Sequence, residues 1–317
     1  EKCINTINEN KKYFNHSAIT ADISDMLNGR ALELCGMNRG ELFLLAGGPP
    51  CQGFSVQRRG SDIDPRNQLV FKYAQLVDEL YPKYFVMENV TGIAGKRGKT
   101  ILEQLIENLK SVGYVVHIDC LDAQDYGAPQ RRKRYIIVGE RSDMGSYYEY
   151  PLPIEDRVTV RDTIEKLPEP PADGSDYPGI SLHRRDRLSE INLKRIRALK
   201  EGQGREYLPA ELLADCHRID SSVIRYRNVY GRMAWDDVAP TITARFDSFT
   251  RGKFGHPDQD RSISLREGAL LQTFPIDFIF TGNKVDIARQ IGNAVPPAIA
   301  EHIGRSIIEC YKRSGRD

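Results

Sequence analysis

The stretch Leu42-Phe43-Leu44-Leu45-Ala46-Gly47-Gly48-Pro49-Pro50-Cys51-Gln52-Gly53-Phe54-Ser55 joins a short apolar run to a loop of glycine and proline. The apolar run at residues 42–46 predicts a buried β-strand. Glycine allows close backbone approach and proline fixes φ, so the loop would present Cys51 in one orientation at the carboxyl end of this strand. A thiol held in this way is suited to act as a nucleophile, although a lone cysteine is more often a small buried apolar residue.

Apolar runs alternate with amphipathic patterns through the first half of the chain. Further strands are expected at residues 84–87, 114–121 and 135–138, and helices at residues 68–80 and 101–112. Such alternation predicts an α/β fold with a mostly parallel sheet covered by helices on both faces. Ligands of such sheets lie beyond the carboxyl ends of the strands, so the chemistry is expected there.

The composition is that of a folded protein without a membrane span. The 317 residues are 40% hydrophobic and 28% charged, and no apolar run approaches the roughly 20 residues of a transmembrane helix. The six cysteines contain no Cys-x-x-Cys pair, so no metal site is expected, and free thiols indicate a reducing cytoplasm. Basic clusters at residues 131–134, 183–187 and 194–197 could contact phosphate groups or form a solvated surface.

The sequence changes character near residues 147–178, which are rich in Pro, Asp and Glu. We therefore expect a first domain at residues 1–160 and a second, smaller domain at residues 161–282. An amphipathic helical pattern at residues 297–311 indicates that residues 283–317 return to the first domain.

Two further polar motifs lie next to expected strands. Met87-Glu88-Asn89-Val90 ends a strand, so Glu88 would share the sheet edge with Cys51 and could act as an acid, or serve only as a cap or salt-bridge partner. Gln130-Arg131-Arg132-Lys133-Arg134 precedes the strand expected at Tyr135. Because strand residues alternate faces, Gln130, Arg132 and Arg134 should point together and could bind an anion, or form a surface row of salt bridges.

These three motifs, in this order, resemble the DNA (cytosine-5) methyltransferase family, in which Pro-Cys-Gln, Glu-Asn-Val and Gln-x-Arg-x-Arg build one pocket. The resemblance covers nearly the whole chain, and residues 229–275 look like bacterial modification enzymes in particular. It implies a Rossmann-like fold for S-adenosylmethionine-dependent methyltransferases, with residues 161–282 as a smaller target-recognition domain and hinge. Further family blocks are similar at residues 64–69, 125–127, 266–275 and 290–297.

The resemblance also implies catalytic roles. Cys51 would attack C6 of a cytosine that is flipped out of the duplex, and Glu88 would protonate N3. The methyl group of S-adenosylmethionine would then pass to C5. Arg132 and Arg134 would hold the pyrimidine O2 while the adduct exists.

Nucleic-acid contacts are implied in two regions. The loop from Gln52 to Arg66 would close over DNA, with Gln52 and Ser55 near the space that the flipped cytosine leaves in the double helix. Thr241 and Ile242 resemble the Thr-aliphatic dipeptide that contacts the backbone beside the flipped nucleotide, although an ordinary strand is the alternative. Gln130 belongs to the same expected interface. Further candidates for base or phosphate contacts are Arg225, Arg227, Arg232 and Arg245.

The cofactor site is implied by six residues. Asp22 and Ile23 resemble the pair that contacts the adenine of the cofactor, and the other lining positions are Pro50, Leu69, Asn293 and Ala294. Family members open with a Gly-rich turn and an acidic residue on the cofactor ribose, and neither occurs in residues 1–317. We expect this part either upstream of Glu1 or on a second polypeptide, and poor cofactor binding without it.

The expected function is methylation of cytosine in a specific sequence of double-stranded DNA, in a bacterial restriction-modification system. The enzyme would act in the cytoplasm as a monomer. Two alternatives stay open: a tRNA cytosine-5 methyltransferase, and a non-catalytic DNA-binding subunit that needs a second chain.

Overall fold

The computed structural model describes residues 2–50, 68–96, 98–145, 148–215 and 229–315. Two compact units share these residues, and the chain passes between them several times. Unit 1 consists of Glu1–Ile19, Ala123–Arg132 and Ile154–Ile299. Unit 2 consists of Thr20–Asp122, Lys133–Pro153 and Ala300–Asp317.

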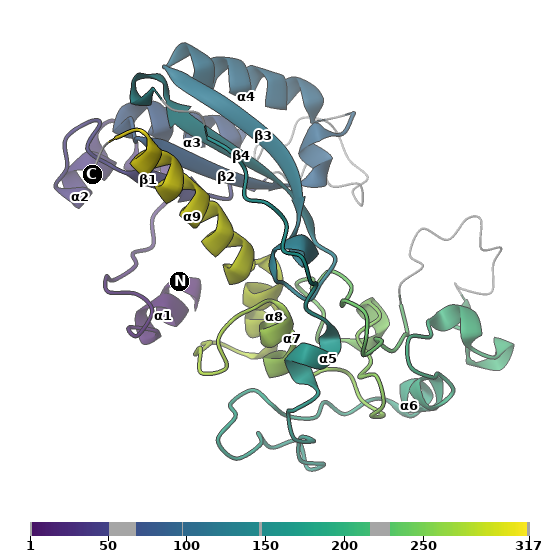
Figure 1. Ribbon diagram of the computed structural model, residues 1–317. Coiled ribbons are helices and arrows are strands. Elements are labelled where there is room, and N and C mark those ends of the chain that lie inside the picture. The colour runs from purple at the N-terminus through teal and green to yellow at the C-terminus, as the bar shows by residue number, and fades with distance from the viewer. Residues whose placement is uncertain (1, 51–67, 97, 146–147, 216–228, 316–317) are drawn as a thin grey trace. The chain divides into compact units, whose positions relative to one another are not determined.

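A four-stranded sheet forms the centre of unit 2 (Figure 1). The strands lie in the order β1-β2-β4-β3. Their bounds are Leu44–Gly47 for β1, Tyr84–Val90 for β2, Tyr114–Asp122 for β3 and Lys133–Arg141 for β4. β1 pairs with β2 in parallel, whereas β4 is antiparallel to both β2 and β3.

The expectation of a mostly parallel sheet is therefore wrong for the described strands, which form a mixed sheet. The α/β architecture itself is confirmed. β3 and β4 are joined by residues 123–132, which contain one turn of 3₁₀ helix at Ala123–Tyr126. Ten residues are too few for the helical crossover that a parallel return needs, so the two strands pair antiparallel.

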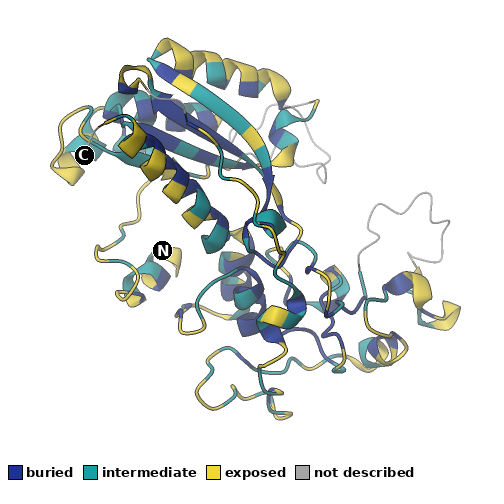
Figure 2. Ribbon diagram, in the orientation of Figure 1, coloured by how far each residue is buried: buried dark blue, intermediate teal, exposed yellow. Residues whose placement is uncertain are grey.

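Helices cover both faces of this sheet. Helix α3 (Gln68–Leu80) and helix α4 (Lys99–Ser111) pack against one face, where Phe85, Met87 and Ile137 are buried. Helix α9 (Pro297–Arg313) contributes Cys310 to the other face, beside Tyr84 of β2. Figure 2 shows buried residues along the strands and exposed ones on the outer side of α4. The burial of apolar area on both faces stabilises the sheet.

Unit 1 contains helices and irregular segments around two clusters of buried side chains. The larger cluster includes Phe246, Phe254 and Ile291, and the smaller one includes Ile196 and Phe249. The α-helices are α1 (Lys2–Glu9), α5 (Val160–Ile164), α6 (Glu190–Arg197), α7 (Leu265–Leu271) and α8 (Lys284–Asn293).

Short helices complete the two units. Unit 2 also contains α2 (Arg30–Cys35). The other 3₁₀ turns are Ile23–Met26, Thr91–Ala94, Ser142–Met144, Arg205–Tyr207, Ala210–Leu212 and Phe249–Arg251. Within the described ranges, none of the helices is long and apolar enough to cross a membrane.

The two units differ from the expected domains at residues 1–160, 161–282 and 283–317. Residues 1–19 and 283–299 group with residues 154–282, and the chain returns to unit 2 only at Ala300. The reason is that α1 bonds to the segment before α8. Thr6 contacts Thr281, and Asn10 donates to the carbonyl of Ile279 at 2.7 Å.

Candidate active site

The loop that leads to Cys51 is attached to the end of β2 in unit 2. Asn89 is buried, and its Nδ2 donates to the carbonyl oxygen of Pro49 at 3.1 Å. A Cβ added to Gly48 would lie 3.4 Å from Oε2 of Glu88, an ordinary van der Waals distance, so this part of the loop lies next to the carboxylate. Cys51 lies outside the described residues. Its nearest described neighbours are nevertheless held beside Glu88.

Glu88 and Arg134 form an ion pair on the same face of the sheet. Nε of Arg134 lies 2.7 Å from Oε1 of Glu88, and their side chains are 18% and 19% exposed, respectively. Because Glu88 pairs with Ile136 and Arg134 with Val90, the two charged residues are diagonal neighbours on β2 and β4. Their partial exposure leaves a carboxyl group and a guanidinium group within reach of one ligand. Such a pair can supply a proton and hold an oxygen atom.

Gln130 and Arg132 do not belong to β4, which begins at Lys133. The expectation that Gln130, Arg132 and Arg134 share one strand is therefore wrong, although the side chains of Gln130 and Arg132 both reach the backbone of Ile242. Arg132 is 2% exposed in unit 1, and its Nη1 and Nη2 donate to the carbonyls of Ile242 and Ala294, both at 3.0 Å. The expected contact of Arg132 with a pyrimidine is corrected accordingly, because its guanidinium group is buried against unit 1 backbone.

Thr241 and Ile242 lie on a segment that runs beside residues 129–132. The amide of Ala239 donates to Pro129 at 2.8 Å, and the amide of Arg131 donates to Ala239 at 2.9 Å. The hydroxyl of Thr241 donates to the carbonyl of Arg131. Ile242 is buried, and its amide donates to the side-chain oxygen of Gln130 at 3.1 Å. These two residues are thus built into the backbone framework of unit 1.

The residues expected to contact the cofactor are divided between the units. In unit 2, Asp22 caps the turn Ile23–Met26, and its Oδ1 accepts bonds from the hydroxyl of Ser24 at 2.6 Å and from the amide of Ser24 at 2.8 Å. These bonds lower the pKa of the exposed Asp22 carboxyl. Pro50 is exposed after β1, and Leu69 lies in the first turn of α3.

Asn293 and Ala294 line a cavity of about 440 Å³ that lies within unit 1. This volume falls in the range of small-molecule sites, roughly 300–1,000 Å³. Part of its wall consists of the side chains of Phe14, Phe274, Phe278 and Phe280. Aromatic faces can stack on a heterocyclic base and attract a cationic group, so this wall is suited to a ligand that has both. The other lining residues are Lys2, Cys3, Thr6, Ile7, Asp286, Arg289 and Gln290.

Five of the ten Lys and Arg residues in the basic clusters form ion pairs with carboxylates, as does Arg245 outside them. This favours the alternative of a solvated or structural role for these side chains over a free phosphate site. Besides Arg134 with Glu88, the pairs are Arg131 with Asp237 at 2.6 Å, Arg184 with Asp176 at 4.0 Å, Arg185 with Glu169 at 3.6 Å, Arg197 with Asp260 at 3.2 Å and Arg245 with Asp247 at 3.0 Å.

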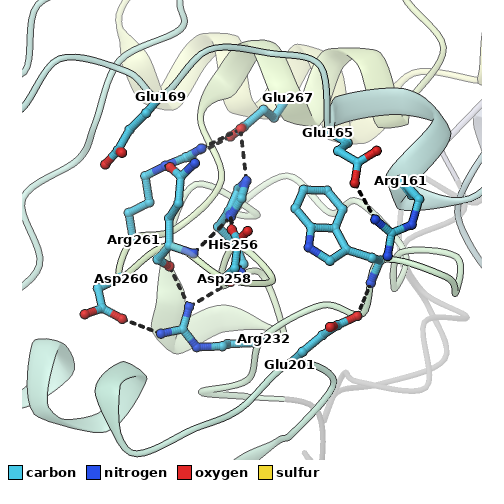
Figure 3. Close-up of polar contacts among 12 residues, drawn as sticks. Arg161, Glu165, Glu169, Glu201, Arg232, His256, Asp258, Asp260, Arg261 and Glu267 are labelled. Atoms are coloured by element: carbon cyan, nitrogen blue, oxygen red, sulfur yellow. Dashed lines mark hydrogen bonds and ion pairs between the residues drawn. The ribbon is translucent and has the colours of Figure 1, made fainter.

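Arg232 is 4% exposed and lies inside unit 1 (Figure 3). Its Nε donates to the carbonyl of Leu199 at 2.9 Å, and its Nη2 pairs with Asp260. The expected base or phosphate contact of Arg232 is therefore wrong, because this side chain ties the end of α6 to residues 256–260. Arg225 and Arg227 lie outside the described residues.

Figure 3 also shows a buried ion pair that supports α7. Nη1 and Nη2 of Arg261 each donate to a different carboxylate oxygen of Glu267 at 2.7 Å, and both residues are at most 1% exposed. Burial raises the pKa of Glu267, but the hydrogen bonds and charge of Arg261 outweigh it and lower the pKa to about 2. Burial lowers the pKa of His256, beside Glu267, to about 4. Glu267 is therefore charged and His256 neutral at pH 7.

Three residues with clear structural functions received no role from the sequence alone. Asn89 and Gln272 stand inside quoted family blocks, but nothing in a linear sequence shows which backbone groups their amides reach. Glu267 did carry a readable signal. It stands three residues after Ser264, the spacing of a capping box, and both of its reciprocal bonds are present.

The chain is similar to known proteins over nearly its whole length. The family model for C-5 cytosine-specific DNA methylase matches residues 1–309. Type II methylase M.HgiDII of Herpetosiphon aurantiacus is 38% identical over 268 residues, covering 83% of this chain and 75% of that protein. Type II methyltransferase M.XorII of Xanthomonas oryzae is 32% identical over 328 residues and covers 94% of this chain and 75% of its own length.

Solved structures agree with these sequence matches. A structure described as a DNA modification methyltransferase encoded within an E. coli prophage superposes with a TM-score of 0.76 at 26% identity. The match covers 98% of this chain and 90% of that one. A methyltransferase of Entamoeba histolytica shares the fold, with a TM-score of 0.62 at 14% identity.

Proposed function

The chain belongs to the family of C-5 cytosine-specific DNA methylases, and from this we propose that it methylates C5 of cytosine in a specific sequence of duplex DNA. The observation that carries the proposal is the pair of Glu88 and Arg134 next to the anchored loop before Cys51. The Type II enzymes among its relatives support a place in a restriction-modification system.

Cys51 is the nucleophile of the proposed reaction. Its thiolate sulfur bonds to C6 of the cytosine. The π electrons of the C5–C6 double bond shift to C5, where they are conjugated with C4 and N3. Glu88 delivers a proton to N3, so the ring does not have to carry a full negative charge. C5 becomes nucleophilic as a result. After C5 carries the methyl group, a solvent water accepts the C5 proton, the released electron pair forms the C5–C6 double bond again as the Cys51 thiolate leaves, and the N3 proton returns to Glu88, which restores the aromatic ring.

Arg134 holds the pyrimidine in the proposed site. Its guanidinium group is next to the Glu88 carboxylate and can donate to the O2 oxygen of the base. It also keeps the Glu88 side chain in one position while the proton moves. Arg132 takes no part in this contact, because both of its Nη atoms are bonded to unit 1 backbone.

The cofactor of the proposed reaction is S-adenosylmethionine, which supplies an electrophilic methyl group when bound. Asn293 and Ala294 would hold it beside the apolar wall of the unit 1 cavity. In unit 2, Asp22 and Ile23 are the proposed adenine contacts, and Pro50 and Leu69 are further proposed lining positions. The aromatic lining of the unit 1 cavity fits a ligand that has a heterocyclic base and a cationic group.

Duplex DNA is the proposed substrate, and residues 161–282 would recognise its sequence. The target base must leave the stack, since C5 and C6 cannot be approached from both sides inside a duplex. Gln52, Ser55 and Arg66 lie outside the described residues. We propose that the loop from Gln52 to Arg66 closes over DNA, with Gln52 and Ser55 near the space that the flipped base leaves in the helix. Thr241 would contact the backbone next to the flipped nucleotide. The enzyme would act as a monomer.

The alternative substrate is tRNA. The Dnmt2 structures that share this fold are 16% identical and therefore support the fold alone. The relatives that are 32–38% identical over most of the chain are Type II DNA enzymes. A non-catalytic subunit is less consistent with the intact pair of Glu88 and Arg134, since a protein without this chemistry has no need for it.

A methylation assay tests the proposal. The full encoded polypeptide is incubated with S-[methyl-³H]adenosylmethionine and either bacterial genomic DNA from an unmethylated strain or bulk tRNA. We expect label in DNA, at 5-methylcytosine after digestion to nucleosides. Label in tRNA alone, or in neither nucleic acid, would contradict the proposal.

A further inference from the structure

Three polar side chains lie fully buried next to one another in unit 1, outside the charged group of Figure 3. Gln130 and Gln272 are 0% exposed and Arg132 is 2% exposed. Buried amide and guanidinium groups are costly unless they are hydrogen-bonded. The hydrogen-bond partners of these three side chains therefore indicate their role.

One end of this group holds the backbone of Ile242. The side-chain oxygen of Gln130 accepts from the amide of Ile242 at 3.1 Å, and Nη1 of Arg132 donates to its carbonyl at 3.0 Å. Both polar backbone groups of this residue are thus bonded to side chains. Because Ile242 follows Thr241 directly, the group determines where the Thr241 peptide lies.

The other end holds the backbone of Ala294. Nε2 of Gln272 and Nη2 of Arg132 both donate to its carbonyl, each at 3.0 Å. Nε2 of Gln272 also donates to the carbonyl of Ile291 at 2.7 Å, in the last turn of α8. Two residues of the cavity lining, Asn293 at the end of α8 and Ala294 directly after it, depend on this turn for their position.

The two ends are connected directly. Nε2 of Gln130 donates to the side-chain oxygen of Gln272 and to the carbonyl of Leu271, the latter at 2.9 Å. Arg132 spans the same distance by itself, from Ile242 to Ala294. A displacement of either backbone segment must therefore break or move bonds made by the other one.

We propose that Gln272 is a positioning residue that couples nucleotide binding beside Thr241 to cofactor binding beside Ala294. The proposal rests on the proposed function, which assigns these two segments to the nucleic acid and to S-adenosylmethionine. Ordering of one segment by its ligand orders the other through Gln130, Gln272 and Arg132. Each ligand then raises the affinity for the other by the same factor, as linkage requires.

The test measures this coupling factor. The Kd of S-adenosylmethionine is measured by calorimetry with and without a cognate duplex, using the full encoded polypeptide and its Gln272→Met and Gln272→Glu variants. Met keeps the length of the side chain and loses its polar atoms, whereas Glu keeps the acceptor for Gln130 and loses the donors to Ile291 and Ala294. Gln104→Met on the exposed face of α4 is the matched control.

For the wild type and for Gln104→Met we expect a coupling factor of roughly 5 or more, the lower range for coupled sites. Both Gln272 variants should have a factor near 1 and a higher Kd for the cofactor even without DNA. Gln130→Met should reduce the factor as well, and the double variant with Gln272→Met should be no worse than the single ones, since both residues belong to one network.

A wild-type protein that methylates DNA while both folded Gln272 variants keep its coupling factor would overturn the inference and leave the proposed function intact. Failure of both variants to fold would also overturn it, because the network would then be purely structural. If the wild type does not methylate DNA, the proposed function itself fails.

Discussion

Glu88 and Arg134 hold each other in place across neighbouring strands, with Nε and Oε1 2.7 Å apart. At the scale of single residues, this contact holds the acid that we propose in one position in unit 2. Asn89 adds to it, because its bond to Pro49 brings the loop before Cys51 to the same strand end. One strand therefore presents the acid and anchors the loop.

Replacement of the acid tests its role. Glu88→Gln keeps the size and polarity of the side chain but cannot deliver a proton, so we expect kcat to fall by roughly 10²–10⁴ while KM for DNA changes little. Steady-state methylation kinetics measure both. Glu103→Gln, in an exposed pair with Lys99 on α4, is the control and should keep the wild-type kcat. A Glu88→Gln enzyme with wild-type kcat would show that N3 is protonated by another group.

The positions of these side chains could be predicted from the sequence only in part. The position of Glu88 could be predicted, because a carboxylate at the end of a strand must lie at the sheet edge. The orientation of Arg132 could not. The alternation of side chains along a strand predicts which way a residue points only when that residue belongs to the strand. β4 begins at Lys133, one residue after Arg132.

At the scale of elements, α8 lies unusually close to the segment after Ile242. A Cβ on Gly292 would lie 2.2 Å from the carbonyl carbon and oxygen of Thr243. Both are backbone atoms, which cannot move aside as a flexible side chain can. Glycine at this position therefore allows the last turn of α8 to contact the segment that carries Thr241.

A matched pair of substitutions tests this contact. Gly292→Ala should lower the free energy of unfolding by about 1–3 kcal/mol or more, because the added methyl group overlaps backbone. Gly304→Ala in α9, where no atom lies within 4 Å of the added Cβ, should raise it by roughly 0.5–1 kcal/mol. Urea unfolding measures both values. Equal effects of the two substitutions would mean that α8 does not approach Thr243 closely.

Elements were predicted well where the pattern is local. The bounds of α3, Gln68–Leu80, are those expected from its apolar spacing, because one face of this helix packs on the sheet. β1 was expected at residues 42–46 and spans Leu44–Gly47. Strand direction could not be predicted in the same way. It depends on whether a connection is long enough to cross the sheet, and the link between β3 and β4 is not.

At the scale of the whole molecule, the division of the chain could be predicted least. Residues 1–19 group with unit 1 because of bonds from α1 to residues 277–286, and no local pattern in either segment reveals such a contact. No local pattern reveals the ion pairs of the buried charges in unit 1 either. Their partners, such as Arg232 and Asp260, lie 28 residues apart.

These buried charges predict how stability depends on pH. The pKa of His256 is lowered by burial and by the charge of Arg261 from 6.5 to about 4, so the unfolded chain takes up a proton on this residue below about pH 6.5 while the folded protein does not until about pH 4. The free energy of unfolding should therefore fall as the pH decreases from 6.5 to 4. Glu267, whose pKa is lowered to about 2, adds a further loss between about pH 4.5 and 2.

The variant His256→Gln isolates the first of these effects. It cannot take up the proton, so its unfolding free energy should change less between pH 6.5 and 4 than that of the wild type. Urea unfolding at pH 7, 6, 5 and 4 measures the difference. Gln104→Met, on the exposed face of α4 in unit 2, removes no titratable group, so it serves as the control and should keep the wild-type pH dependence. Identical curves for His256→Gln and the wild type would show that His256 is not buried in its neutral form.

Covalent trapping tests the central claim most directly, that Cys51 attacks a cytosine ring in DNA. The full encoded polypeptide is incubated with S-adenosylmethionine and duplex DNA that carries 5-fluorocytosine, whose fluorine cannot be lost as the C5 proton is. We expect an adduct that survives denaturation, maps to Cys51 by mass spectrometry, and forms in Cys120→Ser but not in Cys51→Ser. A protein that methylates DNA but yields no adduct, or an adduct on another residue, would contradict the account.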